Sequence, residues 1–288
     1  MNIVYFVFGS NINYYQQVIF SICTALVNKE ESDRIIVIAE EPTLFKLVAD
    51  FVTIIPIDND IISEWKGDYN FIFRTKIKAL QLIAERYPDQ HILYLDGDTF
   101  FYKSLTVLKQ ELYKGNGIMH VKEDALYQKK TKTEKKLWSK VKDKTFANIL
   151  VDKSINMWNA GVIGIPNTNF DLINVALQIN DEMCDNNALC FLVEQLSFSI
   201  VLEKQLKLNA CDHVIGHYWG NKEEWDVIIS DWMKKSLMSN YTLQEMIEEV
   251  KNVPFHEIPV YVKRSNTGIR LTKKIQTMFK PRSKSYIK

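Results

Sequence analysis

Residues 91–99 read His-Ile-Leu-Tyr-Leu-Asp-Gly-Asp-Thr, an apolar run that ends abruptly in two acids. A short apolar run bounded by turn residues is typical of a buried strand. The pattern therefore places Asp96 and Asp98 at the carboxyl end of a strand, where open α/β sheets bind ligands. Two carboxylates supply the hard oxygen ligands that Mg²⁺ or Mn²⁺ prefers. Such a pair also occurs in solvated turns, so its position after a strand is what indicates a cation site.

Strand-like and helix-like stretches alternate along the chain around this segment. Residues 3–8, 34–39 and 52–57 are short apolar runs, and residues 74–86 carry an apolar stripe at helical spacing. Residues 158–165 resume the strand pattern. Alternation of this kind predicts an α/β protein with a mostly parallel central sheet flanked by helices.

The composition is that of an ordinary folded protein, with 47% hydrophobic and 25% charged residues among 288. No internal repeat or low-complexity linker interrupts the chain. The simplest division is one α/β domain over residues 1–230 and a C-terminal helical appendage over residues 231–288. Within the appendage, residues 231–251 are predicted to form one polar amphipathic helix.

The cysteines indicate neither a zinc site nor a redox motif, because none of the four forms a C-x-x-C pair. Reduced thiols are typical of a cytosolic compartment. No signal peptide is evident, and no stretch approaches the roughly 20 apolar residues that span a bilayer. These features predict a cytoplasmic protein.

The C-terminal tail is strongly basic. Residues 263–288 contain nine Lys or Arg and no acid, so the net charge of +1 leaves −8 on the rest of the chain. Apolar residues lie between the basic ones, which suits an anionic membrane surface at the inner face of the cell membrane. A solvated tail is the alternative. Nucleic acid is not an expected partner, because the rest of the molecule is acidic and lacks a stacking motif.

A second basic segment, residues 129–144, carries eight lysines against Glu134 and Asp143. It has too few apolar residues for a core element, so we interpret it as a surface helix or a mobile loop. A solvated face and a lid over the acceptor site both stay open as roles for this segment.

Residues 217–222, His-Tyr-Trp-Gly-Asn-Lys, bring together three groups that suit a phosphate ligand. The imidazole of His217 can complete a metal site begun by carboxylates. Gly220 lets the backbone approach a diphosphate closely, and the ammonium of Lys222 can contact its charge. The alternative is an aromatic-rich turn in which His217 only makes a hydrogen bond.

Five segments together carry a family resemblance, and they occur in that family's order: residues 73–80, 92–99, 158–162, 194–195 and 217–222. Over about residues 1–226, the chain resembles glycosyltransferase family 8, which comprises retaining galactosyl- and glucosyltransferases of GT-A fold. The resemblance implies a GT-A fold, a nucleotide-sugar donor and a divalent cation, Mn²⁺ or Mg²⁺.

The resemblance also implies roles for individual residues. Asp96, Asp98 and His217 are expected to bind the metal, with Asp96 also contacting the ribose. Arg74 is expected to reach toward the nucleotide or the carboxylates. Eight further residues are expected to contact the donor. Asn159 and Gly161 would line the sugar pocket, Glu194 would bind sugar hydroxyls, and Gln195 would lie beneath the anomeric carbon; Gly9, Ser10, Gly220 and Lys222 would contact the nucleotide or its diphosphate.

The expected reaction is transfer of a hexose, with UDP-hexose as donor, to a glycan or glycolipid acceptor in polysaccharide or lipopolysaccharide synthesis at the cell surface. Retention is favoured, as the resemblance implies, by a same-face, ion-pair-like route in which the leaving phosphate accepts the acceptor's proton. Gln195 is neutral and a poor nucleophile, so no covalent intermediate through it is expected. An inverting enzyme would need a carboxylate base, for which Asp185, Glu194 and Asp212 are candidates. An inactive sugar-nucleotide-binding module also stays open. A nucleotidyltransferase is disfavoured, because no Gly-rich basic loop follows the first strand.

Overall fold

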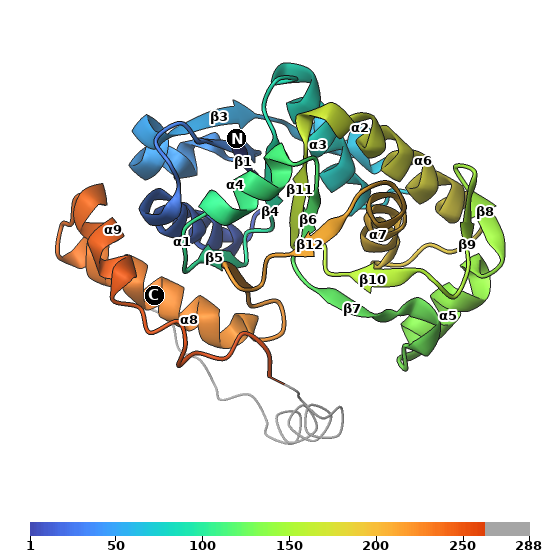
Figure 1. Ribbon diagram of the computed structural model, residues 1–288. Coiled ribbons are helices and arrows are strands. Elements are labelled where there is room, and N and C mark those ends of the chain that lie inside the picture. Colours follow the sequence, from blue (N-terminus) through green and yellow to red (C-terminus); the bar gives the residue numbers. More distant parts are fainter. Residues whose placement is uncertain (263–288) are drawn as a thin grey trace, which may run out of the picture.

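A seven-stranded sheet forms the centre of the computed structural model, which describes residues 1–262 (Figure 1). The strand order is β12-β6-β11-β4-β1-β2-β3. Only β11 runs antiparallel to its neighbours β4 and β6, so the expected mostly parallel sheet is confirmed. The strands are β1 (Asn2–Val7), β2 (Arg34–Ala39), β3 (Val52–Pro56), β4 (Ile92–Leu95), β6 (Gly117–Met119), β11 (Val162–Ile165) and β12 (Leu208–Ala210).

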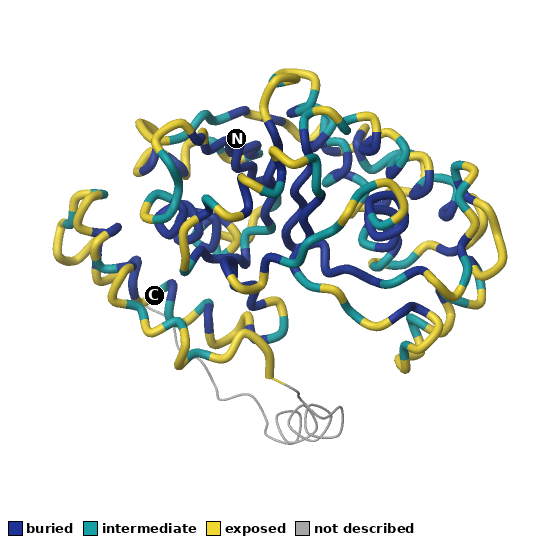
Figure 2. The backbone as a smooth tube through the Cα atoms, viewed as in Figure 1, coloured by how far each residue is buried: buried dark blue, intermediate teal, exposed yellow. Residues whose placement is uncertain are grey.

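The sheet separates two hydrophobic cores, and alternate residues of one strand face each of them. In β1, Val4 and Phe6 belong to one core, whereas Ile3 and Tyr5 belong to the other. A strand buried on both faces needs apolar residues at successive positions, which explains the continuous apolar runs in the sequence. The buried band through the middle of the molecule follows these strands (Figure 2).

Helices cover both faces of the sheet and complete three layers (Figure 1). One face packs against α2 (Asn59–Lys66), α3 (Arg74–Arg86), α6 (Asp171–Asp185) and α7 (Val193–Gln205). The other face packs against α1 (Ile12–Asn28), η1 (Pro42–Phe51), α4 (Thr106–Tyr113), α8 (Lys222–Met238) and α9 (Leu243–Lys251).

The C-terminal helical region differs from the expected single helix over residues 231–251. Two helices, α8 and α9, occupy it because Asn240 has a left-handed φ of 53° and Thr242 caps a new helix start. α8 begins at Lys222 and runs through residue 230, while the division into domains at that residue stays a prediction. The basic tail, residues 263–288, lies outside the described residues.

Three two-stranded ladders lie outside this sheet. They pair β5 (Thr99–Phe101) with β13 (Ile215–His217), β7 (Lys122–Ala125) with β10 (Asn156–Trp158), and β8 (Lys144–Phe146) with β9 (Ile149–Val151). The expected strand over residues 158–165 is therefore two strands, β10 and β11, interrupted at residues 159–161.

The lysine-rich segment holds a helix rather than a mobile loop. This helix, α5 (Lys132–Val141), starts at a capping box in which the side chains of Thr131 and Glu134 bind each other's backbone N–H. Among residues 1–262, no helix combines the length and the apolar character that crossing a bilayer requires.

Candidate active site

The two acids after β4 meet a histidine that is remote in sequence. β13 pairs antiparallel with β5, and their register places His217 opposite Thr99. The backbone N–H of Tyr218 also donates to the carbonyl of Asp98, at 3.1 Å. These bonds hold the imidazole beside the buried Asp98 carboxylate, with Nε2 3.4 Å from Oδ2.

Asp96, Asp98 and His217 form a group that fits one cation. One potential ligand atom from each lies within 4.8 Å of the others. Two ligands on opposite sides of a small divalent cation are about 4–4.5 Å apart, so slight side-chain adjustment brings all three into contact with one ion. Two carboxylate oxygens and one imidazole nitrogen suit Mn²⁺ or Mg²⁺. The expected convergence of these three residues is therefore present in the fold.

Asn159 orients the imidazole of His217. Its Oδ1 accepts a hydrogen bond from the N–H of Gly161 at 3.0 Å, which identifies that atom as the oxygen. The same oxygen lies 2.9 Å from Nδ1 of His217, so Nδ1 carries a proton and donates it. Nε2 is then the nitrogen that faces Asp98 and can bind a cation once deprotonated. Asn159 and Gly161, expected to line a sugar pocket, thus pack directly against His217.

We predict that Gly161→Ala weakens metal binding. A Cβ at this position would overlap the imidazole of His217, so the ring must leave its present position beside Asp98. Disturbing a residue that orients a ligand costs about 10–100-fold in metal affinity, measurable by calorimetric titration with Mn²⁺. Gly115→Ala is the control, because it strains a positive φ of 79° where no atom lies within 4 Å of a Cβ. Equal Mn²⁺ affinity in the two variants would contradict this role of Gly161.

Asp98 is held as a carboxylate. Burial alone would raise the pKa of this carboxyl, but the charges of His217 and Lys222 hold it well below its usual range. The ammonium of Lys222 lies 2.9 Å from Oδ2 of Asp98, and its side chain is 46% exposed. Lys222 thus lies beside Asp98, with a partly exposed side chain that can turn toward a ligand.

A buried lysine, which the sequence analysis did not single out, links the site to α7. Nζ of Lys76 lies 3.0 Å from Asp96 and 3.4 Å from Glu194, and it donates to the carbonyl of Ala160. Burial opposes the charge of this ammonium, but the two carboxylates raise its pKa above the usual range. Lys76 therefore holds the partly exposed Asp96 and the buried Glu194 together.

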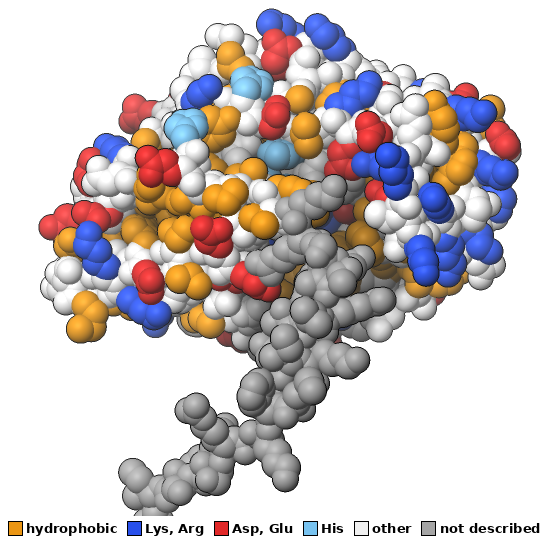
Figure 3. Space-filling model, turned by 90° about the horizontal axis from the view of Figure 1, so that it is seen from below, with side chains coloured by type: hydrophobic (Ala, Val, Ile, Leu, Met, Phe, Trp, Pro, Cys, Tyr) orange, Lys and Arg blue, Asp and Glu red, His pale blue; other side chains and the backbone are white. Residues whose placement is uncertain are grey.

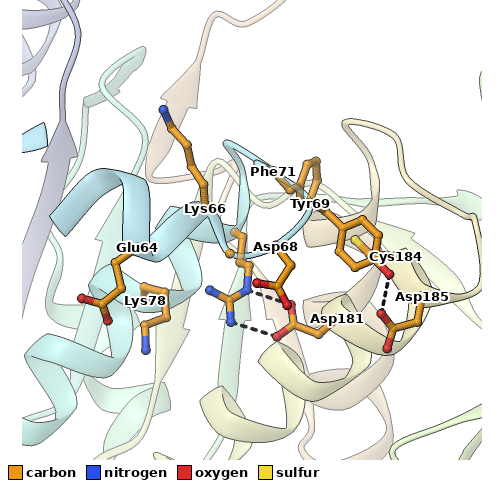
Figure 4. Close-up of a pocket in the computed structure, with 11 residues that line it drawn as sticks. Glu64, Lys66, Asp68, Tyr69, Phe71, Lys78, Asp181, Cys184 and Asp185 are labelled. Atoms are coloured by element: carbon orange, nitrogen blue, oxygen red, sulfur yellow. Dashed lines mark hydrogen bonds and ion pairs between the residues drawn. The ribbon is translucent and has the colours of Figure 1, made fainter. Parts of the chain in front are cut away.

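Arg74 does not reach the carboxylates. Its guanidinium binds both oxygens of Asp181 on α6, at 2.8 and 2.9 Å, and the carbonyl of Trp65. It lines a cavity of about 420 Å³ whose wall includes Asp181 (Figure 4). Residues that are two positions apart in a helix point about 200° apart around its axis. Lys76 therefore faces the sheet edge, whereas Arg74 faces α6. Lys76 occupies the place expected for Arg74.

Glu194 and Gln195 lie in the first turn of α7. Glu194 is buried, and burial raises its pKa to about 7, with Lys76 opposing and Asp96 adding to the shift. The contact with Lys76 brings Glu194 into the same cluster as Asp96. Gln195 is the next residue and is partly exposed, and its backbone carbonyl accepts a hydrogen bond from Ser199.

The glycines expected near the nucleotide lie in different surroundings. Gly9 follows β1, the parallel neighbour of β4, so it and the exposed Ser10 lie at the same sheet edge as Asp96. The φ of Gly9 is 89°, and its N–H donates to Glu40. Gly220 lies directly under the ring of Tyr261, where a Cβ would overlap that ring.

His120 is a further residue that the sequence pattern did not reveal. Its ring packs edge-on against that of His217, with centroids 5.2 Å apart, and its Nε2 contacts the carbonyl of Ile215 at 3.0 Å. Burial, followed by the charge of His217, lowers the pKa of His120 to about 4. A neutral His120 therefore supports the strand that carries His217.

The three layers, the sheet order and the site at the sheet edge define the GT-A fold of glycosyltransferases, as expected from the resemblance to family 8. Among solved structures, the galactosyltransferase LgtC in complex with donor and acceptor sugar analogs matches with a TM-score of 0.50. It is 14% identical, over 72% of this chain and 73% of that one. Mouse xyloside xylosyltransferase 1 in its apo form matches with a TM-score of 0.48 and 12% identity, over 73% and 85%. No protein-family model and no curated protein sequence matches the chain.

Proposed function

We propose that the protein is a metal-dependent glycosyltransferase that moves a hexose from a nucleotide sugar, UDP-hexose in our assignment, to a glycan or glycolipid acceptor. The observation that carries this proposal is the convergence of Asp96, Asp98 and His217 at the carboxyl edge of a GT-A sheet. The proposed pathway is synthesis of a cell-surface polysaccharide or lipopolysaccharide.

The residues around this group have distinct proposed tasks. A divalent cation held by Asp96, Asp98 and His217 would stabilise charge on the leaving diphosphate as a Lewis acid. Lys222, now paired with Asp98, would turn its exposed ammonium toward the same diphosphate. Lys76 keeps Asp96 and Glu194 in place, so that Glu194 can accept hydrogen bonds from sugar hydroxyls.

We propose retention of configuration. In this route the leaving diphosphate accepts the proton of the acceptor hydroxyl on the same face of the sugar, and Gln195 does not act as a nucleophile. Inversion has one observation in its favour, because a pKa of about 7 suits Glu194 to act as a general base. Asp185 is less suited, since it accepts a hydrogen bond from Tyr69 and lines the cavity around Arg74 (Figure 4). The anomeric configuration of the product, read by NMR, decides between the two routes.

A thermal-shift panel of nucleotide sugars, each with Mn²⁺ or with EDTA, tests the proposal. Binding to the folded state at a hundred times Kd stabilises it by about 2.7 kcal/mol, which corresponds to a rise of several degrees in Tm. We expect this rise with at least one UDP-sugar, and only when Mn²⁺ is present. No shift with any donor, or a shift that EDTA leaves unchanged, would contradict a metal-dependent transferase.

A further inference from the structure

The outer face of α5 carries an unusual concentration of unpaired positive charge. We call this the lysine face, and it consists of Lys132, Lys135, Lys136, Lys140 and Lys142. Within residues 1–262, none of these five ammonium groups forms an ion pair. The acid on the same helix, Glu134, is already engaged by the backbone of Thr131 and by Lys129. The charge of the lysine face is therefore available to an anionic partner.

Exposed apolar side chains lie directly beside the lysine face. Leu189 and Phe191, in the loop before α7, are 46% and 56% exposed. They share with Lys136 and Lys140 a cavity of about 270 Å³ whose wall also includes the buried Leu137. Figure 3 shows Lys and Arg side chains gathered at the right-hand end of the molecule, with hydrophobic side chains beside them, and α5 occupies that end in Figure 1.

Positive charge next to exposed apolar side chains matches the chemistry of one kind of surface. An anionic bilayer offers phosphate groups to lysines and an acyl boundary to Leu and Phe side chains. Nucleic acid would use the lysines and could stack one base on Phe191, but it has no comparable use for the exposed aliphatic side chain of Leu189. The apolar face of α5 itself is occupied, because Leu137 and Val141 are buried in the core. The lysines lie on the part of the helix that faces away from that core.

We propose that the lysine face, together with Leu189 and Phe191, docks on an anionic phospholipid membrane. The loop that carries Leu189 and Phe191 leads directly into α7, whose first turn holds Glu194 and Gln195. Docking through this surface brings the start of α7 close to the bilayer. The proposal is independent of the transferase activity and of the tail at residues 263–288.

Vesicle sedimentation with the full chain tests this proposal. The vesicles contain phosphatidylcholine alone or with about one third phosphatidylglycerol. One variant neutralises four of the five lysines of the face, and a control variant makes the same change in charge at exposed lysines elsewhere. The first carries Lys132→Gln, Lys135→Gln, Lys136→Gln and Lys140→Gln; the control carries Lys46→Gln, Lys103→Gln, Lys207→Gln and Lys234→Gln.

We expect the wild-type chain and the control to bind only the anionic vesicles, less tightly as salt rises. Each lysine near such a surface contributes about fivefold in affinity, so the first variant should lose at least roughly 100-fold. Phe191→Ser should weaken binding to anionic vesicles by the same factor at low and at high salt. Equal binding by both lysine variants would overturn the proposal, because both retain the basic tail. Failure of the wild-type chain to bind anionic vesicles, or displacement from them by a short DNA duplex, would overturn it too.

Discussion

Replacing Asp98 with asparagine is expected to lower kcat/KM for sugar transfer by at least about a thousandfold, because cation stabilisation of a leaving group contributes several kcal/mol. Asparagine keeps the size of the side chain but removes the charge that faces His217 and Lys222. The cation would then lose a carboxylate ligand, and the nearby ammonium of Lys222 would no longer be neutralised. The Mn²⁺-dependent part of the thermal shift with the donor should disappear as well.

Asp50→Asn is the control for this experiment, because Asp50 is exposed at the end of η1 and its loss removes the same charge. The control should keep both activity and the Mn²⁺-dependent shift. Calorimetry with Mn²⁺ alone separates the loss of metal binding from a loss of folding, which circular dichroism reports. A folded Asp98→Asn variant with full activity would refute the assignment of the metal site.

Lys76→Met is expected to lower the free energy of unfolding by about 3–5 kcal/mol, the usual cost of removing one partner from a buried ion pair. Methionine fills the space of the lysine stem but leaves Asp96 and the buried Glu194 without their shared cation. Part of the loss should be recovered at low pH. Protonation of Glu194, whose pKa is already about 7, then removes one of the two negative charges.

Denaturant unfolding at pH 8 and pH 5 measures this effect, and Lys78→Met provides the control. Lys78 lies on the same helix and faces the cavity around Arg74, where its loss leaves the two acids paired with Lys76 (Figure 4). Adding Glu194→Gln to Lys76→Met should restore most of the lost stability at pH 8, with an interaction energy visible in the double-mutant cycle. A loss of stability that is independent of both pH and Glu194 would show that Lys76 contributes only packing.

Local periodicity predicted most of the fold. β2 and α3 have the bounds that the apolar patterns at residues 34–39 and 74–86 indicated. The mostly parallel sheet was also predictable, because strands alternate with helices along the chain. Each strand is buried on both faces and therefore appears in the sequence as a continuous apolar run. Errors arose where one residue changes the backbone, as at Asn240, whose positive φ separates α8 from α9.

The residues of the metal group were recognisable in the sequence. Asp96 and Asp98 directly follow an apolar strand, and His217 lies three residues before Gly220. Their contacts were less accessible to sequence analysis. The bond between Asn159 and His217, and the position of His120, both join segments far apart in the chain. The sequence does not decide whether Lys76 or Arg74 contacts Asp96, because both are cations in the same helix. The rotation of α3 about its axis directs Lys76 to Asp96 and Arg74 to Asp181 on α6.

The order of residues along the chain thus specifies where strands end and which side chains can bind a cation, because these properties depend on neighbours within a few positions. Which of those side chains meet depends on the pairing of β5 with β13 and on the packing of helices against the sheet. Those contacts form between distant segments, and a shift of one residue in a strand turns its side chains to the opposite face. Three-dimensional packing therefore selected Lys76 over Arg74 and placed His217 beside Asp98.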